Sequence, residues 1–251
     1  MVNLNIFTCC NGIYKDFIPL FIYSNLINTD DVFVEVGVDF DDINDSPPIQ
    51  FLNNLFPNKF LIRTVNFGEY FVNGENILPM PNLVRFITEP LVKSNYVYIS
   101  DVDIITLDTD ITKKHINNIT SNNLKYSNIV RDYTKDQKHK RLTGLHFTKY
   151  ENYYPIYDYS EICKLGLFNH DEMFLYELMK KRHGEPNENV KWRPVHGIHV
   201  SPNRKPDGKI NWGIDIWSKQ WVIFRNSKTF KELELLMSDY VKDKLKIIDN
   251  F

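Results

Sequence analysis

Segments typical of β-strands alternate with segments typical of helices over roughly the first 110 residues, and no other feature of the chain limits the fold so strongly. The predicted strands are apolar runs rich in Val, Ile and Phe, at residues 4–10, 31–40, 59–67 and 95–107. The predicted helices between them have apolar residues at helical spacing, at 14–26, 49–56 and 82–94. We expect the last helix to break or kink at Pro90. The alternation predicts an α/β fold with a mostly parallel central sheet.

The second half of the chain is less regular. The segments expected to form loops are polar or rich in Pro and Gly, at residues 113–124, 131–141 and 185–213. The segments expected to be regular are a strand and turn at 141–154 and amphipathic helices at 171–183 and 227–248. The first of these helices has basic residues in its last turn and Gly184 after it, which is a typical helix end. No repeat or linker is evident, so we predict one domain, with a loop-rich C-terminal part.

Composition excludes several classes of protein. The 251 residues are 43% hydrophobic and carry 30 basic against 32 acidic side chains, well mixed, so duplex nucleic acid is not an expected partner. No apolar run reaches about 18 residues and no signal peptide begins the chain, so no transmembrane segment is predicted. Cys9, Cys10 and Cys163 are too few and too unevenly spaced for a disulfide framework, which favours a reduced, cytoplasmic setting.

Asp101 and Asp103 follow an almost uninterrupted apolar and aromatic run, at the carboxyl edge of the predicted sheet, where parallel sheets bind their ligands. Side chains two positions apart on an extended segment point to the same side, so the two carboxylates would form an oxygen-rich site. Such a site suits magnesium or manganese, and magnesium commonly completes its shell with phosphate oxygens. The pattern therefore predicts a metal-bound phosphorylated ligand. The alternative is that both residues cap a surface turn after the strand.

Four landmarks occur in an order that resembles the metal-dependent glycosyltransferases of the GT-A fold, especially the glycogenin and galactosyltransferase-like family eight. They are a helix and strand ending in Asp-x-Asp, a Gly segment, an acidic helix start and a late His motif, at residues 82–107, 141–147, 169–179 and 195–206. The chain departs from the family at Thr143, where the family has Asn, and at Glu172, where it has Gln. The late His motif is also rearranged.

The resemblance implies a Rossmann-like GT-A sheet with helices on both faces. It also implies transfer of a sugar from a nucleotide sugar, a UDP-sugar above all, to a hydroxyl of a glycan or lipid-linked acceptor, as in polysaccharide biosynthesis. Manganese or magnesium would neutralise the charge of the departing diphosphate. Asp103 would ligate the metal directly, and Asp101 would contact the ribose and the metal. A histidine would complete the site: His199 or His196, with His199 preferred because Lys-Pro follows it.

The resemblance also implies residues that hold the donor. Lys205, or else Arg204 or Lys209, would neutralise the diphosphate, unless these residues are simply a solvated charge run. Arg85 would brace the donor phosphates or the first Asp; the alternative is an exposed helix cation.

The segment after the first strand would grip the nucleotide. Backbone groups of Thr8 and Cys9 would contact it and Tyr14 would stack on the base, while Asp39 would accept hydrogen bonds from base or ribose. Cys9 and Cys10 have a plain alternative role as small residues packing the strand.

Asp171 and Glu172 begin a helix, where acids are favoured by the helix dipole whatever their function. As catalytic residues, one of them would be the general base of an inverting enzyme, or would orient the sugar in a retaining enzyme. The four tryptophans fall within one short window, at 192, 212, 217 and 221, and form either an acceptor platform or core.

The family resemblance divides the chain into a nucleotide-binding half (1–110), an acceptor and metal half (111–227) and a C-terminal helix (228–251). That helix is expected to pack on its own domain, with peripheral membrane contact or a second subunit as alternatives. Two rival functions remain: a phosphatase of the haloacid dehalogenase class that uses Asp101 and Asp103, and a glycan-binding domain without turnover.

Overall fold

The structure is a computed structural model, and it describes residues 2–40, 42–72, 74–132, 139–156, 159, 161–162, 165–200 and 213–250. In this part of the chain the central sheet has six strands, in the spatial order β3 (Phe60–Thr64), β2 (Val32–Val38), β1 (Val2–Cys10), β6 (Ser94–Ile99), β11 (His146–Lys149) and β8 (Tyr126–Ser127). The first four are parallel, and β11 runs antiparallel to both of its neighbours. The predicted mostly parallel sheet is therefore confirmed.

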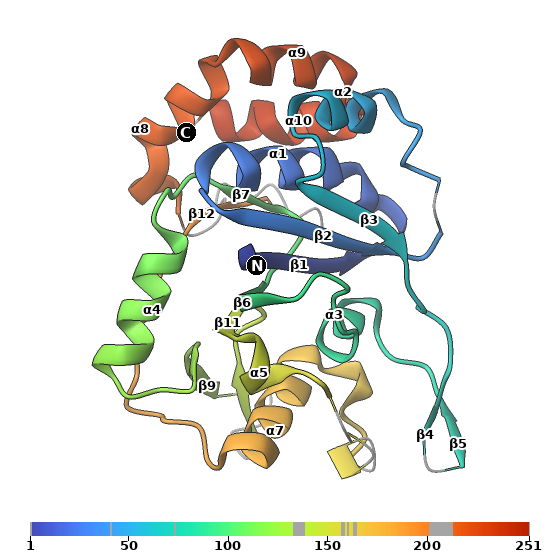
Figure 1. Cartoon of the computed structure of the whole chain (residues 1–251), viewed down its shortest axis with the longest axis vertical. Coiled ribbons are helices and arrows are strands. Elements are labelled where there is room, and N and C mark those ends of the chain that lie inside the picture. Colours follow the sequence, from blue (N-terminus) through green and yellow to red (C-terminus); the bar gives the residue numbers. More distant parts are fainter. Residues whose placement is uncertain are drawn as a thin grey trace.

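Short strands also pair outside this sheet. They are β4 (Tyr70–Val72) with β5 (Glu75–Ile77), β9 (Val130–Asp132) with β10 (Lys140–Leu142), and β7 (Ile104–Thr106) with β12 (Gly197–His199). The β4–β5 hairpin extends away from the rest of the chain (Figure 1).

Helices cover both faces of the sheet (Figure 1). On one face lie α1 (Ile18–Asn28), α2 (Pro47–Leu55), α9 (Lys228–Leu236) and α10 (Asp239–Asp249). On the other lie α3 (Val84–Ile87), α5 (Tyr150–Tyr153) and α7 (Asp171–His183). Further helical segments with described bounds are η1 (Gly12–Phe17), η2 (Pro81–Leu83), α4 (Ile111–Ser121), η3 (Leu167–Asn169) and α8 (Ile214–Asn226). None of the described helices is both long enough and apolar enough to cross a bilayer.

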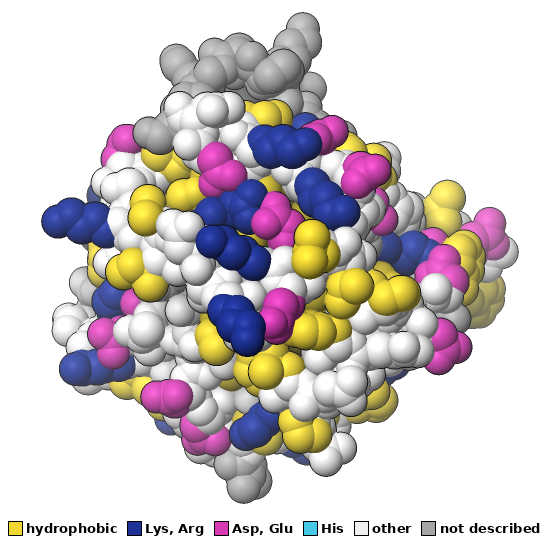
Figure 2. Space-filling view, turned by 90° about the horizontal axis from the view of Figure 1, so that it is seen from above, with side chains coloured by type: hydrophobic (Ala, Val, Ile, Leu, Met, Phe, Trp, Pro, Cys, Tyr) yellow, Lys and Arg dark blue, Asp and Glu magenta, His cyan; other side chains and the backbone are white. Residues whose placement is uncertain are grey.

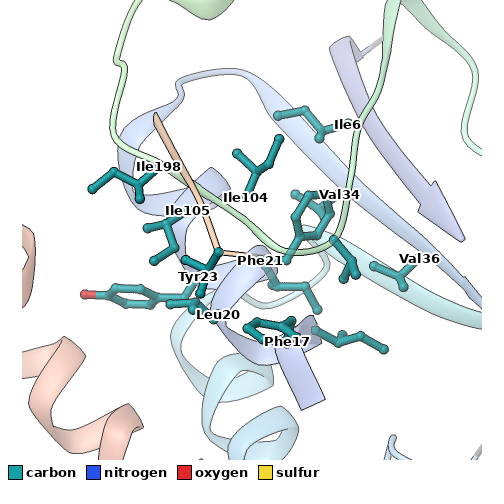
Figure 3. Packing of buried hydrophobic residues seen from close by; sticks show 14 of the residues in the cluster. Ile6, Phe17, Leu20, Phe21, Tyr23, Val34, Val36, Ile104, Ile105 and Ile198 are labelled. Atoms are coloured by element: carbon teal, nitrogen blue, oxygen red, sulfur yellow. The ribbon is translucent and has the colours of Figure 1, made fainter. Parts of the chain in front are cut away.

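The sheet separates two hydrophobic cores, because successive side chains of a strand point to opposite faces. On the α1 face, Ile6 of β1 and Val34 of β2 pack with Phe21 (Figure 3). On the α7 face, Phe7 packs in the cluster that contains Phe174. Strand β1 is thus buried on both faces, in keeping with its mostly apolar sequence.

Two predicted boundaries in the first half were wrong. Residues 82–94 do not form a helix that reaches the break expected at Pro90: α3 already ends at Ile87, and beyond Pro90 the backbone N–H groups of Leu91 and Val92 donate to the buried Glu35 carboxylate. Residues 95–107 do not form one strand either. β6 ends at Ile99, a turn carries the two Asp residues, and β7 then pairs with β12 instead of the central sheet.

The loop predicted at 113–124 is mostly helix, since α4 spans Ile111–Ser121. Its buried face presents Ile111, His115 and Asn118, and the last two donate to or accept from Ser127. Sequence analysis missed this helix because His115 and Asn118 on its buried face are polar and the segment as a whole is rich in Asn and Lys.

The predicted single C-terminal helix is two helices. α9 ends at Leu236, and Ser238 begins α10 by accepting a hydrogen bond from the backbone N–H of Val241. Both helices pack on their own domain, through buried apolar residues such as Phe230 and Leu245. On the face that the C-terminal helices help to form, basic and acidic side chains are interspersed (Figure 2). The segment predicted as a loop at 131–141 contains the end of β9 and the start of β10, and its residues 133–138 lie outside the described part of the chain.

Candidate active site and metal centre

A cavity of about 500 Å³ opens where β1 and β6 end, within the size range of small-molecule sites. The two strands are adjacent and parallel, and the N–H of Ser100 donates to the carbonyl of Phe7 at 2.9 Å. Their carboxyl ends therefore deliver side chains to one place. The cavity is lined by residues from β1 and η1, the turn after β6, and the starts of η2, α3 and α7, together with Gly144 and His199.

Asp101, Asp103 and His199 form a cluster in this cavity whose ligand atoms all lie within 4.8 Å of one another. His199 Nε2 lies 3.1 Å from Asp103 Oδ1, and Asp103 is only 5% exposed. The pairing of β12 with β7 places His199 opposite Ile104, next to Asp103. Two carboxylates and one imidazole are a donor set that suits a divalent cation. These residues therefore fit the metal that the sequence analysis expects.

Arg85 joins the two acidic parts of the cavity. Its Nη1 lies 2.6 Å from Asp101 Oδ1 and its Nη2 lies 3.2 Å from Asp171 Oδ2. The side chain is 6% exposed, so it is a buried brace and not the exposed helix cation of the alternative interpretation. Of its two expected contacts, the structure shows the one with the first Asp.

Asp171 and Glu172 both line the cavity but in different environments. Burial raises the pKa of Asp171, an effect that Arg85 opposes and the carboxylates of Glu172 and Asp101 reinforce. Glu172 accepts a hydrogen bond from the N–H of Gly144 at 2.9 Å and forms an ion pair with Arg141. Glu172 is thus held by the Gly144 N–H and by Arg141, whereas burial makes Asp171 easier to protonate.

His196 does not join the cluster. Its Nδ1 lies 2.9 Å from Asp108 Oδ2 and its Nε2 lies 2.6 Å from the Nε2 of His115, so both ring nitrogens have partners outside the cavity. Of the two histidines that sequence analysis left open, the structure brings only His199 to the Asp pair.

Of the four residues expected to contact the nucleotide, two lie at the cavity and two do not. Cys9 and Tyr14 line the cavity, whereas Thr8 and Asp39 do not. Thr8 is fully buried inside β1, and Asp39 lies 3.2 Å from the Nζ of Lys15. Burial raises the pKa of the Cys9 thiol to about 12, in keeping with a packing role. Desolvation and the nearby Asp103 and Asp101 raise the pKa of Tyr14 to about 12, so its hydroxyl stays neutral beside the carboxylates.

The remaining expectations concern cations and tryptophans. Lys205, with its alternatives Arg204 and Lys209, and Trp212 lie outside the described residues. Trp217 and Trp221 are buried in the core on the α1 face, so they are not part of a sugar platform, whereas Trp192 is exposed.

Met80 and Pro81, at the start of η2, are among the cavity-lining residues that sequence analysis did not single out. They precede a helix that the sequence predicted to begin at about the same place, but no motif or spacing distinguishes them from an ordinary helix start.

Comparison with known proteins identifies the fold. No protein-family model and no curated protein matches the chain. A structure of the galactosyltransferase LgtC in complex with donor and acceptor sugar analogs is similar to it, with a TM-score of 0.50 and 12% sequence identity over 91% of this chain and 99% of LgtC. A structure of the glycosyltransferase GlyE from Streptococcus pneumoniae TIGR4 has a TM-score of 0.43 and 9% identity over 76% of this chain. The match covers 47% of the GlyE chain, so this chain spans about half of its length. The likeness to LgtC confirms the GT-A fold.

Proposed function

We propose that the protein is a metal-dependent glycosyltransferase that moves a sugar from a nucleotide sugar, above all a UDP-sugar, to a hydroxyl group of a glycan or lipid-linked acceptor. One observation carries the proposal: two carboxylates and an imidazole from segments about 96 residues apart converge in a cavity at the carboxyl edge of a GT-A sheet. Structures with this fold include a galactosyltransferase with donor and acceptor analogs bound.

In this proposal Asp101, Asp103 and His199 would hold manganese or magnesium. The bound cation would supply charge neutralisation at the diphosphate leaving group. Arg85 keeps Asp101 in place, because a buried guanidinium with two carboxylate partners has one favourable position. The three ligand side chains are thus oriented before any donor binds.

The same proposal gives the other cavity residues distinct roles. Tyr14 offers a neutral aromatic face and hydroxyl to the nucleoside part of the donor. Glu172, fixed by Gly144 and Arg141, orients the transferred sugar or the acceptor. Asp171 has the higher proton affinity expected of a group that accepts a proton from the acceptor hydroxyl, if the reaction inverts.

The test is release of UDP from a panel of UDP-sugars, with and without manganese, by the unaltered chain and by Asp103→Asn. The amide keeps the size of the side chain and removes the charge that a cation needs. We expect manganese-dependent release in the unaltered chain and a loss of at least about a hundredfold in the variant. Manganese should also raise the melting temperature of the unaltered chain but not that of Asp103→Asn.

Asp243→Asn is the matched control, because this exposed carboxylate on α10 pairs only with Lys246 at 2.8 Å in the described residues. It should leave release and the manganese effect unchanged. Equal loss in both variants would contradict the assignment of the site. Phosphate release from simple phosphomonoesters without nucleotide preference would instead favour the phosphatase, and glycan binding that survives Asp103→Asn would favour the binding domain.

A further inference from the structure

A buried chain of hydrogen bonds outside the cavity joins the segments after β7 and before β12 to α4 and β8. It runs from Asp108 through His196 and His115 to Ser127, with distances of 2.9 Å, 2.6 Å and 2.7 Å. All four residues are at most 3% exposed. We call these four residues the histidine relay. It lies outside the cavity, and the proposed chemistry does not use it.

The hydrogen bonds of the relay can be assigned a single direction. Burial raises the pKa of Asp108, but hydrogen bonds from His196 and Lys114 lower it to about 2, so this carboxylate only accepts. His196 must therefore donate from Nδ1, which leaves its Nε2 as an acceptor when the ring is neutral. His115 must then donate from Nε2 and accept at Nδ1 from the hydroxyl of Ser127. Burial lowers the pKa of both rings, in keeping with two neutral histidines.

The relay is also fixed sterically. The ring of His115 stacks on Phe147 with ring centres 4.5 Å apart, and Tyr98 contacts His115 and His196 with ring centres 5.1 Å and 5.5 Å apart. Ser127 Oγ accepts a further hydrogen bond from Asn118 at 2.7 Å. Every polar atom of the two rings is therefore paired, and the rings are enclosed by aromatic side chains.

His196 immediately precedes β12, the strand that carries His199. Its carbonyl accepts from the N–H groups of Leu107 and Asp108, and at the other end of β12 the N–H of Val200 donates to the carbonyl of Asp103 at 2.7 Å. Between these anchors β12 has only three residues, and within the described part of the chain it pairs with β7 alone. So short a strand has little register preference of its own, and a shift by one residue would turn His199 away from Asp103.

We propose that the histidine relay is a positioning device for the metal site: it holds β12 in one register on β7, so that His199 faces Asp103. The relay achieves this by joining the residue before β12 to α4 and to β8 of the central sheet. His115, His196 and Ser127 are thus positioning residues. The expected effect on metal binding rests on the proposed function, whereas the expected effect on the register of β12 does not.

The experiment compares His115→Leu with His115→Gln. Leucine fills the space but cannot donate to His196, whereas the amide nitrogen of glutamine can replace the Nε2 donor. In metal-free protein, His115→Leu should speed amide hydrogen exchange at Leu107 and Val200, the N–H groups at the two ends of the β7–β12 pair. Its affinity for manganese should fall about 10- to 100-fold, as for other residues that orient metal ligands. In His115→Gln, amide exchange at Leu107 and Val200 and the affinity for manganese should both stay close to those of the unaltered chain.

Asn5→Ala is the control, because this fully buried polar residue bonds Glu35 and the carbonyl of Val92, away from the relay and the cavity. It should lower stability without changing manganese affinity or exchange at Leu107 and Val200. Nitrogen-15 NMR of the unaltered chain at neutral pH should show His196 protonated at Nδ1 and His115 at Nε2.

The outcomes separate the two proposals. The relay would be overturned as a positioning device by the opposite histidine tautomers, or by unchanged amide exchange at Leu107 and Val200 in His115→Leu. It would also be overturned if Asn5→Ala changed that exchange and the manganese affinity as much as His115→Leu does. Manganese affinity unchanged in His115→Leu despite faster exchange would also overturn it. If the unaltered chain binds no manganese while the tautomers and the exchange are as expected, the proposed function fails and the register role of the relay stands.

Discussion

Arg85 bonds two carboxylates that line the cavity, Asp101 and Asp171, while it is itself almost completely buried. Breaking such an arrangement on one side leaves an uncompensated charge away from water, which is costly. The residue that leaves room for this guanidinium is Gly144: a Cβ added there would lie 2.8 Å from Arg85 Nη2 and 3.7 Å from the Asp101 carboxylate. The absence of a side chain at 144 is therefore a requirement of the site.

Gly144→Ala should displace Arg85 from at least one of its carboxylates. We expect UDP release to fall about tenfold or more, and the free energy of unfolding to fall by about 1–3 kcal/mol, as for other overpacked sites. Activity is measured with the donor panel, and stability by urea unfolding. Gly68→Ala is the control, because this glycine lies in an exposed loop and a Cβ there meets only the Asn66 side chain, at 3.2 Å. Unchanged release by Gly144→Ala would show that Arg85 is not constrained in this way.

At the scale of elements, the β7–β12 pair places two of the three proposed metal ligands. Asp103 directly precedes β7, and His199 ends β12. The two strands approach closely at Gly197, where a Cβ would lie 1.8 Å from the carbonyl oxygen of Ile105. Since that neighbour is backbone, no side-chain movement can relieve the clash. The pairing of β12 with β7 thus requires a glycine at 197, and in our proposal the histidine relay then fixes the register of that pairing.

Gly197→Ala should separate β12 from β7 and so remove His199 from Asp103. Manganese should no longer raise the melting temperature, and the free energy of unfolding should fall by about 1–3 kcal/mol or more. The matched control is Ile198→Val, which removes one buried methylene at the next position and costs about 0.5–1.5 kcal/mol without obstructing the strand pair. Manganese stabilisation retained in Gly197→Ala would contradict the role of this pairing.

At the scale of the whole molecule, the sheet divides the interior into two cores, and both contain histidines that are buried in the neutral form. Burial lowers the pKa of His146 to about 3, and it lowers the pKa values of His115 and His196 as well. In the unfolded chain each would titrate near its ordinary value of about 6.5. Below that pH the unfolded state therefore binds protons that the folded state does not.

Stability should consequently fall as the pH is lowered below about 6.5, and the loss should continue down toward the folded pKa values. Each of the three histidines contributes up to about 1.4 kcal/mol per pH unit in this window. Urea unfolding at pH 7, 6 and 5 measures the slope. His115→Gln removes one titrating group and should make the slope shallower by up to one proton. A free energy of unfolding that is constant between pH 7 and 5 would show that these rings are not held neutral.

Much of the fold could be predicted from the chain because its elements are encoded locally. The apolar runs of β1, β2 and β6 are continuous over a few residues, and α7 is marked by acids in its first turn, buried apolar residues in its middle and basic residues in its last turn. Where the buried face is polar, as in α4, the same reasoning failed. Helix ends also depend on more than the local pattern: α3 ends at Ile87, before the break expected at Pro90, and the distant Glu35 accepts from the N–H groups of Leu91 and Val92 that follow.

The sequence by itself determined the α/β alternation, the parallel sheet and the position of Asp101 and Asp103 at its carboxyl edge, because each follows from a short, self-contained pattern. Only the tertiary structure decided that His199 and not His196 meets the Asp pair, that Arg85 joins Asp101 to Asp171, and that Thr8 and Asp39 stay outside the cavity. The physical reason is that these contacts join segments far apart in the chain. Their positions are fixed by strand register, by buried hydrogen bonds and by the space that glycines leave, none of which has a local sequence period.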